Sequence, residues 1–79
     1  MFAVVIPTRN RPLLISAVLA NLGKQSLKPD CIVVVDSSDL KSESKIKIDG
    51  VPIYYLFTEV KSAAEQRNIG IEFIKESQD

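Results

Sequence analysis

The chain has 79 residues, enough for one small domain. Hydrophobic residues make up 46% of it and charged residues 25%, a composition that argues against disorder. Ten basic and ten acidic residues give no net charge, which argues against a protein that binds nucleic acid or an anionic membrane through bulk electrostatics. Because the chain has no histidine, catalytic triads and metal sites built on histidine are excluded within it.

The single cysteine, Cys31, has no partner within the chain and reads as a small buried side chain in a reducing compartment. The opening residues, MFAVVIPTRN, lack the charged leader and the longer apolar run of a signal peptide. No stretch approaches the roughly 20 apolar residues that a membrane helix needs. We therefore expect a cytoplasmic domain with no membrane segment in this chain.

The first predicted element is a buried strand near residues 2–7, which is apolar, rich in β-branched side chains and closed by Pro7. Asn10 is a candidate helix cap. Apolar residues then recur at helical spacing and predict an amphipathic helix over residues 12–22. Gly23 is a candidate terminator for that helix.

The second predicted strand, near residues 31–36, contains three consecutive valines and does not alternate apolar with polar residues. Such a strand is typical of a parallel sheet that is covered on both faces. Strand, helix and strand in about thirty residues indicate a βαβ unit with a right-handed crossover. The strand ends at Asp36, which is either an ordinary turn residue or part of a site, because ligands bind beyond the carboxyl ends of parallel strands.

The segment of residues 37–50 leaves two interpretations open. Residues 39–43 fit one helical turn, whereas residues 45–48 alternate with period two ahead of Asp49-Gly50, a pair that favours a hairpin turn. The next apolar run predicts a third strand near residues 52–57.

The last predicted element is a helix over residues 63–75. Ser62 and Glu65 have the spacing of a capping box at its start. Gly70 inside the helix indicates either close packing against a neighbour or simple tolerance, at a cost of about 1 kcal/mol relative to alanine. The predicted fold is α/β, with a three-stranded parallel sheet in the order 3-2-1 and helices on opposite faces. Residues 1–79 would form one unit, half of a Rossmann-like domain.

Polar residues gather where this sheet would present the ends of its strands. They are the loop PTRNR at residues 7–11, the turn DSSD at residues 36–39 and the helix start SAAEQRN at residues 62–68. Carboxylate, hydroxyl, guanidinium and backbone amide groups in one crevice suit a nucleotide. The sequence has neither a GxGxxG nor a GxxxxGK[ST] motif, so the dinucleotide and P-loop interpretations have no support.

Three segments together, VVIPTRNRPLL, VVVDSSD and AEQRNIGI, resemble the amino-terminal half of family 2 glycosyltransferases of the GT-A fold. The resemblance covers essentially the whole chain. It implies a transferase that takes a sugar from a nucleotide-diphosphate sugar, with this chain supplying the nucleoside-binding crevice. The residues it implicates are Pro7, Thr8 and Arg9 against the base and ribose, Asp36 and Ser37 against the nucleoside, and Arg67 against the base or diphosphate.

Two positions depart from the family pattern. Arg9 stands where tyrosine is usual, so stacking on a base would come from a guanidinium plane. Ser37 stands where a second acid is usual, which puts the common contact from that acid to the base in doubt and leaves the nucleotide open.

The resemblance also implies a divalent ion, magnesium or manganese, held by an Asp-x-Asp motif after a fourth strand. No such motif occurs in the chain, so the metal ligands and the catalytic base would lie outside it. We therefore expect an amino-terminal piece of a larger enzyme that is inactive alone. We also expect it to form a homodimer or larger assembly, because its first strand would be left as an edge.

Simpler interpretations remain open beside this one. Arg11 fits a solvated loop charge, and Arg67 fits a surface pair with Glu65 or Glu72. The alternative function is a stand-alone α/β module that binds a nucleotide or a partner without catalysis, and a third option is a structural fragment with no activity.

Overall fold

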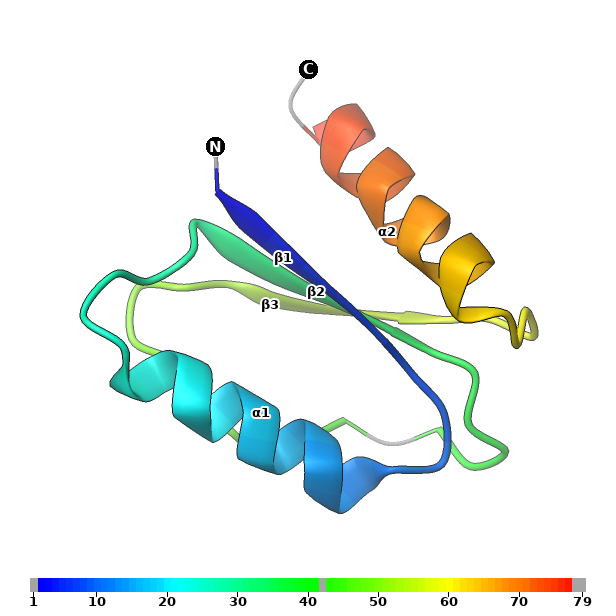
Figure 1. The fold of residues 1–79 in the computed structure, drawn as a ribbon, viewed down its shortest axis with the longest axis horizontal. Helices are drawn as coiled ribbons and strands as arrows, with labels where there is room; N and C mark the ends of the chain where they lie inside the picture. The colour runs from blue at the N-terminus through cyan, green and yellow to red at the C-terminus, as the bar shows by residue number, and fades with distance from the viewer. Residues whose placement is uncertain (1, 42, 78–79) are drawn as a thin grey trace.

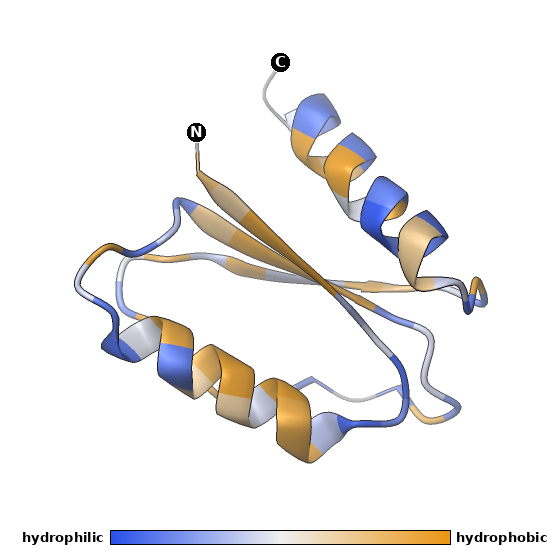
Figure 2. Ribbon diagram, viewed as in Figure 1, coloured by the Kyte–Doolittle hydropathy of each residue, from blue (hydrophilic) through white to orange (hydrophobic). Residues whose placement is uncertain are grey.

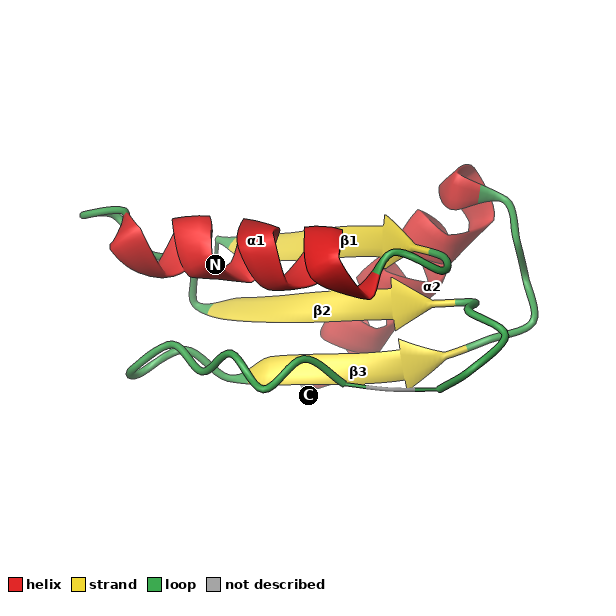
Figure 3. Cartoon of the chain, turned by 90° about the horizontal axis from the view of Figure 1, so that it is seen from below, coloured by secondary structure: helices red, strands yellow, loops and turns green. Residues whose placement is uncertain are grey.

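The computed structural model describes residues 2–41 and 43–77. Three strands and two helices follow one another along the chain: β1 (Ala3–Thr8), α1 (Pro12–Lys24), β2 (Cys31–Asp36), β3 (Ile53–Phe57) and α2 (Ala63–Ser77). All strands are parallel and lie in the order β1-β2-β3, as Figures 1 and 3 show. The predicted α/β class and strand order are therefore confirmed.

The central strand, β2, is buried over its whole length because both faces of the sheet are covered. Figure 1 shows α1 on one side of the sheet and α2 on the other, as predicted. In Figure 2, β1 and β2 carry the hydrophobic colour along most of their length, and the ribbon becomes hydrophilic where they run into their loops. The sequence change from valines to DSSD therefore marks the end of the sheet.

The face of the sheet beneath α1 holds the main core. Ile15 and Leu19 of α1 pack with Ile32 and Val34 of β2 in one buried cluster. Ile48 and Val51, from the segment that joins β2 to β3, complete that cluster. In Figure 3 this segment runs along the same side of the sheet as α1, in front of β3. This segment therefore covers part of the sheet face that a second crossover helix would otherwise cover.

The opposite face is packed closely by α2. A Cβ on Gly70 would collide with Cγ1 of Val5 and would lie 3.3 Å from Cγ2 of Val35. The close-packing interpretation of this glycine is therefore confirmed. The start of the helix also agrees with the sequence, since the Ser62 hydroxyl accepts the N–H of Glu65 at 3.4 Å.

Two predictions about α1 are wrong. The helix continues to Lys24, so Gly23 does not end it; Gly23 instead lies against Ile48, whose Cγ1 would be 3.4 Å from an added Cβ. Asn10 is not the cap, because the residue before the helix is Arg11, which makes no capping side-chain hydrogen bond. Asn10 adopts a left-handed backbone with φ of 55° and bonds to the loop after β2.

The segment between β2 and β3 matches neither of its two interpretations fully. Its described residues contain no helix, and Ser42 of the proposed helical turn lies outside them. The hairpin is reduced to one antiparallel bridge between Ile48 and Val51, with Gly50 in the turn at φ of 77°. The helix α2 extends two residues beyond the predicted end.

Candidate functional site

The carboxyl ends of β1 and β2 are joined at the candidate site. The N–H of Ser37 donates to the carbonyl of Thr8 at 3.1 Å, which extends the ladder beyond the end of β2. The side-chain amide of Gln66 lies beneath this junction. Its Nε2 is 3.1 Å from the Thr8 carbonyl, and 3.2 Å from both the Val35 carbonyl and Ser37 Oγ. The first turns of α2 are thus fixed to both strand ends.

Gln66, which is only 2% exposed, is not among the site residues predicted from the sequence. A signal was present, because Gln66 precedes Gly70 by four residues and therefore shares its helix face. Once Gly70 is placed against the sheet, a polar side chain one turn earlier must meet backbone groups there. A buried amide requires such partners.

Asp36, at the end of the central strand, is 7% exposed. One carboxylate oxygen, Oδ1, accepts the N–H of Ser38 at 2.9 Å and also the Ser38 hydroxyl. The interpretation of Asp36 as a turn residue is therefore confirmed. The other oxygen, Oδ2, accepts no hydrogen bond from residues 2–41 or 43–77. Asp36 lines a cavity, so this oxygen is the one left for a ligand.

The loops after β1 and β2 hold one another. The N–H of Asn10 donates to Ser38 Oγ at 2.6 Å. The Asn10 amide exchanges two hydrogen bonds with Asp39: Nδ2 donates to its carboxylate at 3.2 Å, and Oδ1 accepts its N–H at 3.0 Å. Asparagine tolerates the left-handed backbone at this position better than most residues. The polar ends of both strands therefore form one connected rim.

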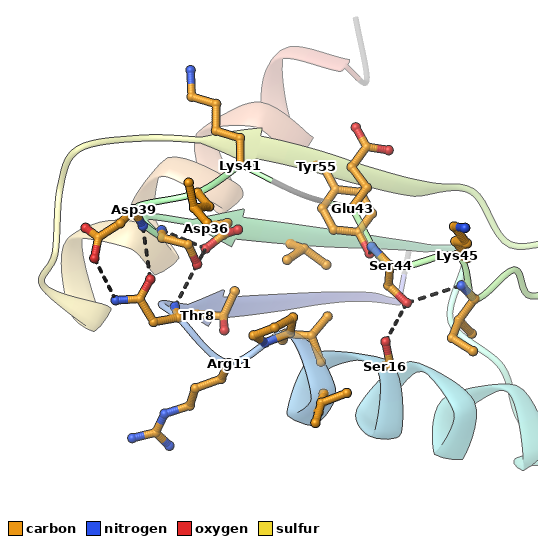
Figure 4. A pocket seen from close by; sticks show the side chains of 18 residues that line it. Thr8, Arg11, Ser16, Asp36, Asp39, Lys41, Glu43, Ser44, Lys45 and Tyr55 are labelled. Carbon is orange, nitrogen blue, oxygen red and sulfur yellow. Dashed lines mark hydrogen bonds between the residues drawn. The ribbon is translucent and has the colours of Figure 1, made fainter.

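A cavity of about 950 Å³, here called the large cavity, opens beside this rim. Figure 4 shows Thr8, Asp36 and Asp39 at one end of it, with Ser16 and Ser44 at the other. The hydroxyls of Ser16 and Ser44 lie 2.9 Å apart, and the Ser44 N–H donates to the Tyr55 hydroxyl at 3.0 Å.

Apolar side chains also line the large cavity, among them Ile15, Val34 and Ile46. An apolar surface with polar groups at its ends is typical of a site for a small organic ligand, and the volume is within the range of such sites. Figure 4 shows the side chains of Lys41 and Arg11 extending away from the Asp36 end.

The second cavity, here called the small cavity, has a volume of about 420 Å³ and lies between the starts of α1 and α2 at the end of β1. Its lining comes from the end of β1 and its loop (Ile6, Pro7, Thr8, Arg9, Asn10, Arg11), from α1 (Leu14, Ile15, Val18) and from the start of α2 (Lys61, Ala63, Gln66). The two cavities share Thr8, Asn10, Arg11 and Ile15. They are therefore neighbours on either side of the loop after β1.

The site residues named from the sequence are not all brought together. Thr8 lines both cavities, Asp36 lines the large one, and Pro7 and Arg9 line the small one. Ser37 is 5% exposed and lines neither cavity, and its hydroxyl contacts the Gln66 amide. The functional roles assigned to these residues stay predictions.

Arg67 is exposed on α2 and lines neither cavity. It makes no salt bridge with Glu65 or Glu72 within the described part of the chain, where Glu72 instead pairs with Lys75. The contact of Arg67 with the base or diphosphate stays a prediction.

A metal centre does not fit the described residues. In residues 2–41 and 43–77, no group of three or more acidic, histidine or cysteine side chains is placed to hold an ion. The divalent ion implied by the resemblance stays a prediction about ligands outside this chain.

Fold and site together define a small α/β domain with a candidate ligand site at the carboxyl ends of a parallel sheet. No protein-family model, curated protein or solved structure matches the chain. Among the described residues, no helix has the length and apolar character needed to span a membrane. The resemblance to family 2 glycosyltransferases therefore rests on the three sequence segments alone.

Proposed function

We propose that the chain supplies the nucleoside-binding part of a glycosyltransferase that uses a nucleotide-diphosphate sugar as donor. The observation that carries the proposal is the carboxylate of Asp36, which is buried at the end of the central strand and keeps Oδ2 for a ligand beside a cavity. Ligands of open α/β sheets bind at such positions. The parallel α/β sheet and the three sequence segments that carry the resemblance add support.

The chemistry expected of this site is recognition. A base N–H or a ribose hydroxyl would donate to Oδ2 of Asp36, a charge-assisted bond that is stronger than a neutral one. The flat base would lie against the apolar lining, which includes Val34 and Ile15. Thr8 lines the same cavity, and its hydroxyl both donates and accepts. The residues of this chain thus bind and orient the donor.

The test is the replacement Asp36→Asn, which removes the charge and keeps the size. The four common ribonucleoside diphosphates are titrated against the chain by NMR chemical shifts. For the nucleotide that binds best, we expect the variant to weaken binding by about 1–3 kcal/mol, the usual loss for a hydrogen bond to a charged group. The matched control is Asp49→Asn, in the exposed turn before β3, which should leave the affinity unchanged.

Circular dichroism spectra of both variants show whether the fold is kept. Wild-type affinity in a folded Asp36→Asn variant would remove this residue from the site. Failure of all four nucleotides to bind would overturn the proposed function as a whole.

Sugar transfer is not expected from the chain alone. The described residues hold no group that could serve as a metal centre, and the resemblance puts both the metal ligands and the catalytic base beyond this chain. Incubation of the purified chain with nucleotide-diphosphate sugars and Mn²⁺ should release no more nucleoside diphosphate than buffer does. Metal-dependent release above that background would mean that the site has been assigned incorrectly.

The alternative is a binding module without catalysis. Both interpretations include the same nucleoside site. They differ in what they predict the gene to encode after Asp79. A further apolar strand followed by Asp-x-Asp supports the transferase, whereas a stop codon supports the module.

A further inference from the structure

The end of the large cavity away from Asp36 carries three hydroxyl groups, here called the hydroxyl cluster. Ser16 belongs to α1, Tyr55 to β3, and Ser44 to the segment that joins β2 to β3. The Ser16 and Ser44 hydroxyls lie 2.9 Å apart, and the Ser44 N–H donates to Tyr55 Oη at 3.0 Å. All three side chains line the cavity, as Figure 4 shows. The cluster therefore offers polar groups deep over the sheet face, apart from the strand ends.

The hydroxyl cluster has more donors than its own members use. Each hydroxyl carries one proton that it can donate. The contact between Ser16 and Ser44 uses one of the three protons, whichever oxygen donates it. Tyr55 Oη accepts the Ser44 N–H, and its own proton has no acceptor within residues 2–41 and 43–77. Two O–H groups therefore lack an acceptor in that part of the chain.

These two O–H groups favour a ligand that brings an acceptor. A carbonyl oxygen has two lone pairs and no proton, so it can accept from both groups. An amino group in the same place brings more donors and leaves the two O–H groups without an acceptor once water is excluded. Polar groups left unpaired in this way lower affinity, and this is how a site rejects a close analogue of its ligand.

The two ends of the large cavity therefore suit opposite groups. At the strand ends, Asp36 Oδ2 is free to accept a hydrogen bond from a ligand. At the other end the hydroxyl cluster is free to donate. Between them lie apolar side chains, among them Ile15, Val34 and Ile46, which suit the faces of a flat ring.

We propose that the hydroxyl cluster recognises the carbonyl oxygen of a keto base, either uracil or a 6-oxopurine, while ribose hydroxyls donate to Asp36. That the ligand is a nucleoside rests on the proposed function. The preference for a keto base rests on the unused O–H groups of the cluster. Tyr55, whose proton has no acceptor among the described residues, is the main specificity-determining residue.

The first experiment compares nucleosides that exchange a carbonyl for an amino group. Uridine against cytidine, and inosine against adenosine, are titrated against the chain by NMR chemical shifts. We expect a keto nucleoside to bind at least fivefold tighter than its amino partner. The tighter of uridine and inosine shows whether the site takes a pyrimidine or a purine. Nucleosides that bind with no keto preference would overturn this inference and leave the proposed function standing.

The second experiment removes the Tyr55 hydroxyl with Tyr55→Phe. The ratio of keto to amino affinity should fall at least threefold. A purely structural role, through the contact with Ser44, would instead weaken both members of a pair equally. The matched control is Tyr54→Phe, because Tyr54 is exposed and lines neither cavity, and it should change the ratio less than twofold. A keto preference that survives in a folded Tyr55→Phe variant would refute the role of the cluster.

The backbone amides give a measurement that needs no variant. The N–H groups of Ser44 and Ile46 bond within the cluster, to Tyr55 Oη and to Ser44 Oγ at 3.2 Å. The Ser38 N–H bonds to Asp36 at the opposite end. A keto nucleoside should shift the amide resonances at both ends. Shifts at Ser38 alone would place the base elsewhere and refute the inference, whereas a folded wild type that binds no nucleoside would overturn the inference and the proposed function together.

Discussion

At the scale of single residues, the amide of Gln66 has an unusual position for a helix side chain. It reaches carbonyl groups at the ends of two strands, Thr8 and Val35, and so extends the hydrogen-bond network of the sheet into α2. A leucine would have similar size but no donor. The carbonyl of Thr8 would keep the Ser37 N–H, and that of Val35 faces the Thr8 N–H in the parallel ladder, but both would lose the amide.

We therefore expect Gln66→Leu to lower the free energy of unfolding by about 1–3 kcal/mol, because the buried amide loses its hydrogen bonds to two carbonyls and a hydroxyl, each of which typically contributes about 0.5–1.5 kcal/mol. Urea denaturation followed by circular dichroism measures it. Asn68→Leu is the matched control, because Asn68 is exposed on the same helix and surface changes there should stay within about 0.5 kcal/mol. Equal midpoints for the two variants would contradict a structural role for the Gln66 amide.

At the scale of elements, the sequence predicts best where the determining signal is local. The run CIVVVD identified β2 because a strand covered on both faces needs apolar residues at every position. The valines therefore predicted both the strand and its parallel setting. The start of α2 was equally local, since Ser62 and Glu65 make their hydrogen bond within one turn.

Prediction failed where a distant partner decides the local structure. Asparagine is a residue type that is favoured at helix caps. The amide of Asn10 instead bonds to Asp39, 29 residues away, and so connects two loops. Glycine is a residue type that often ends a helix, but α1 continues past Gly23, which lies against Ile48. The segment before β3 is held by contacts such as that of Ser44 with Tyr55, which no short window of sequence reveals. The cavities are products of the same long-range contacts.

The contact of α2 with the sheet leads to a prediction at this scale. Alanine favours a helix by about 1 kcal/mol over glycine, so Gly70→Ala would stabilise an isolated helix. In this fold the new methyl would meet Val5 and Val35, and overpacking of a core costs about 1–3 kcal/mol. We expect the variant to be less stable than the wild type on denaturation, whereas Asn68→Ala on the exposed side should be neutral or slightly stabilising. A more stable Gly70→Ala would show that α2 is free to move away from the sheet.

At the scale of the whole molecule, the sheet has β1 at one edge. The carbonyls of Phe2 and Thr8 accept hydrogen bonds from the β2 side, so by alternation the backbone groups of Ala3 and Val5 point outward. From Ala3 to Ile6 the strand carries neither a charged residue nor a proline, the common devices that blunt an edge, and Pro7, which has no N–H, lies only near its end. A neutral chain also does not repel its own copies.

We therefore expect self-association through β1 at micromolar concentration, measured by sedimentation equilibrium. Ala3→Lys places a charge beside the open edge and should shift the chain toward monomer. Ala17→Lys makes the same replacement on the exposed side of α1 and should not. A wild type that is monomeric throughout this range, or equal behaviour of the two variants, would argue against pairing at β1.

The cross-linked rim at the ends of β1 and β2 has a thermodynamic consequence. A loop that is mobile before binding must be ordered by its ligand, and the lost conformational entropy is subtracted from the affinity. Here Asn10, Ser38 and Asp39 already hold both loops in one arrangement without a ligand. The rim is preorganised, so a ligand that reaches it would lose little affinity to loop ordering. The replacement Asn10→Ala would remove two of the hydrogen bonds between the two loops. It would then weaken ligand binding mainly through the entropy of ordering these loops, even if the Asn10 side chain does not contact the ligand.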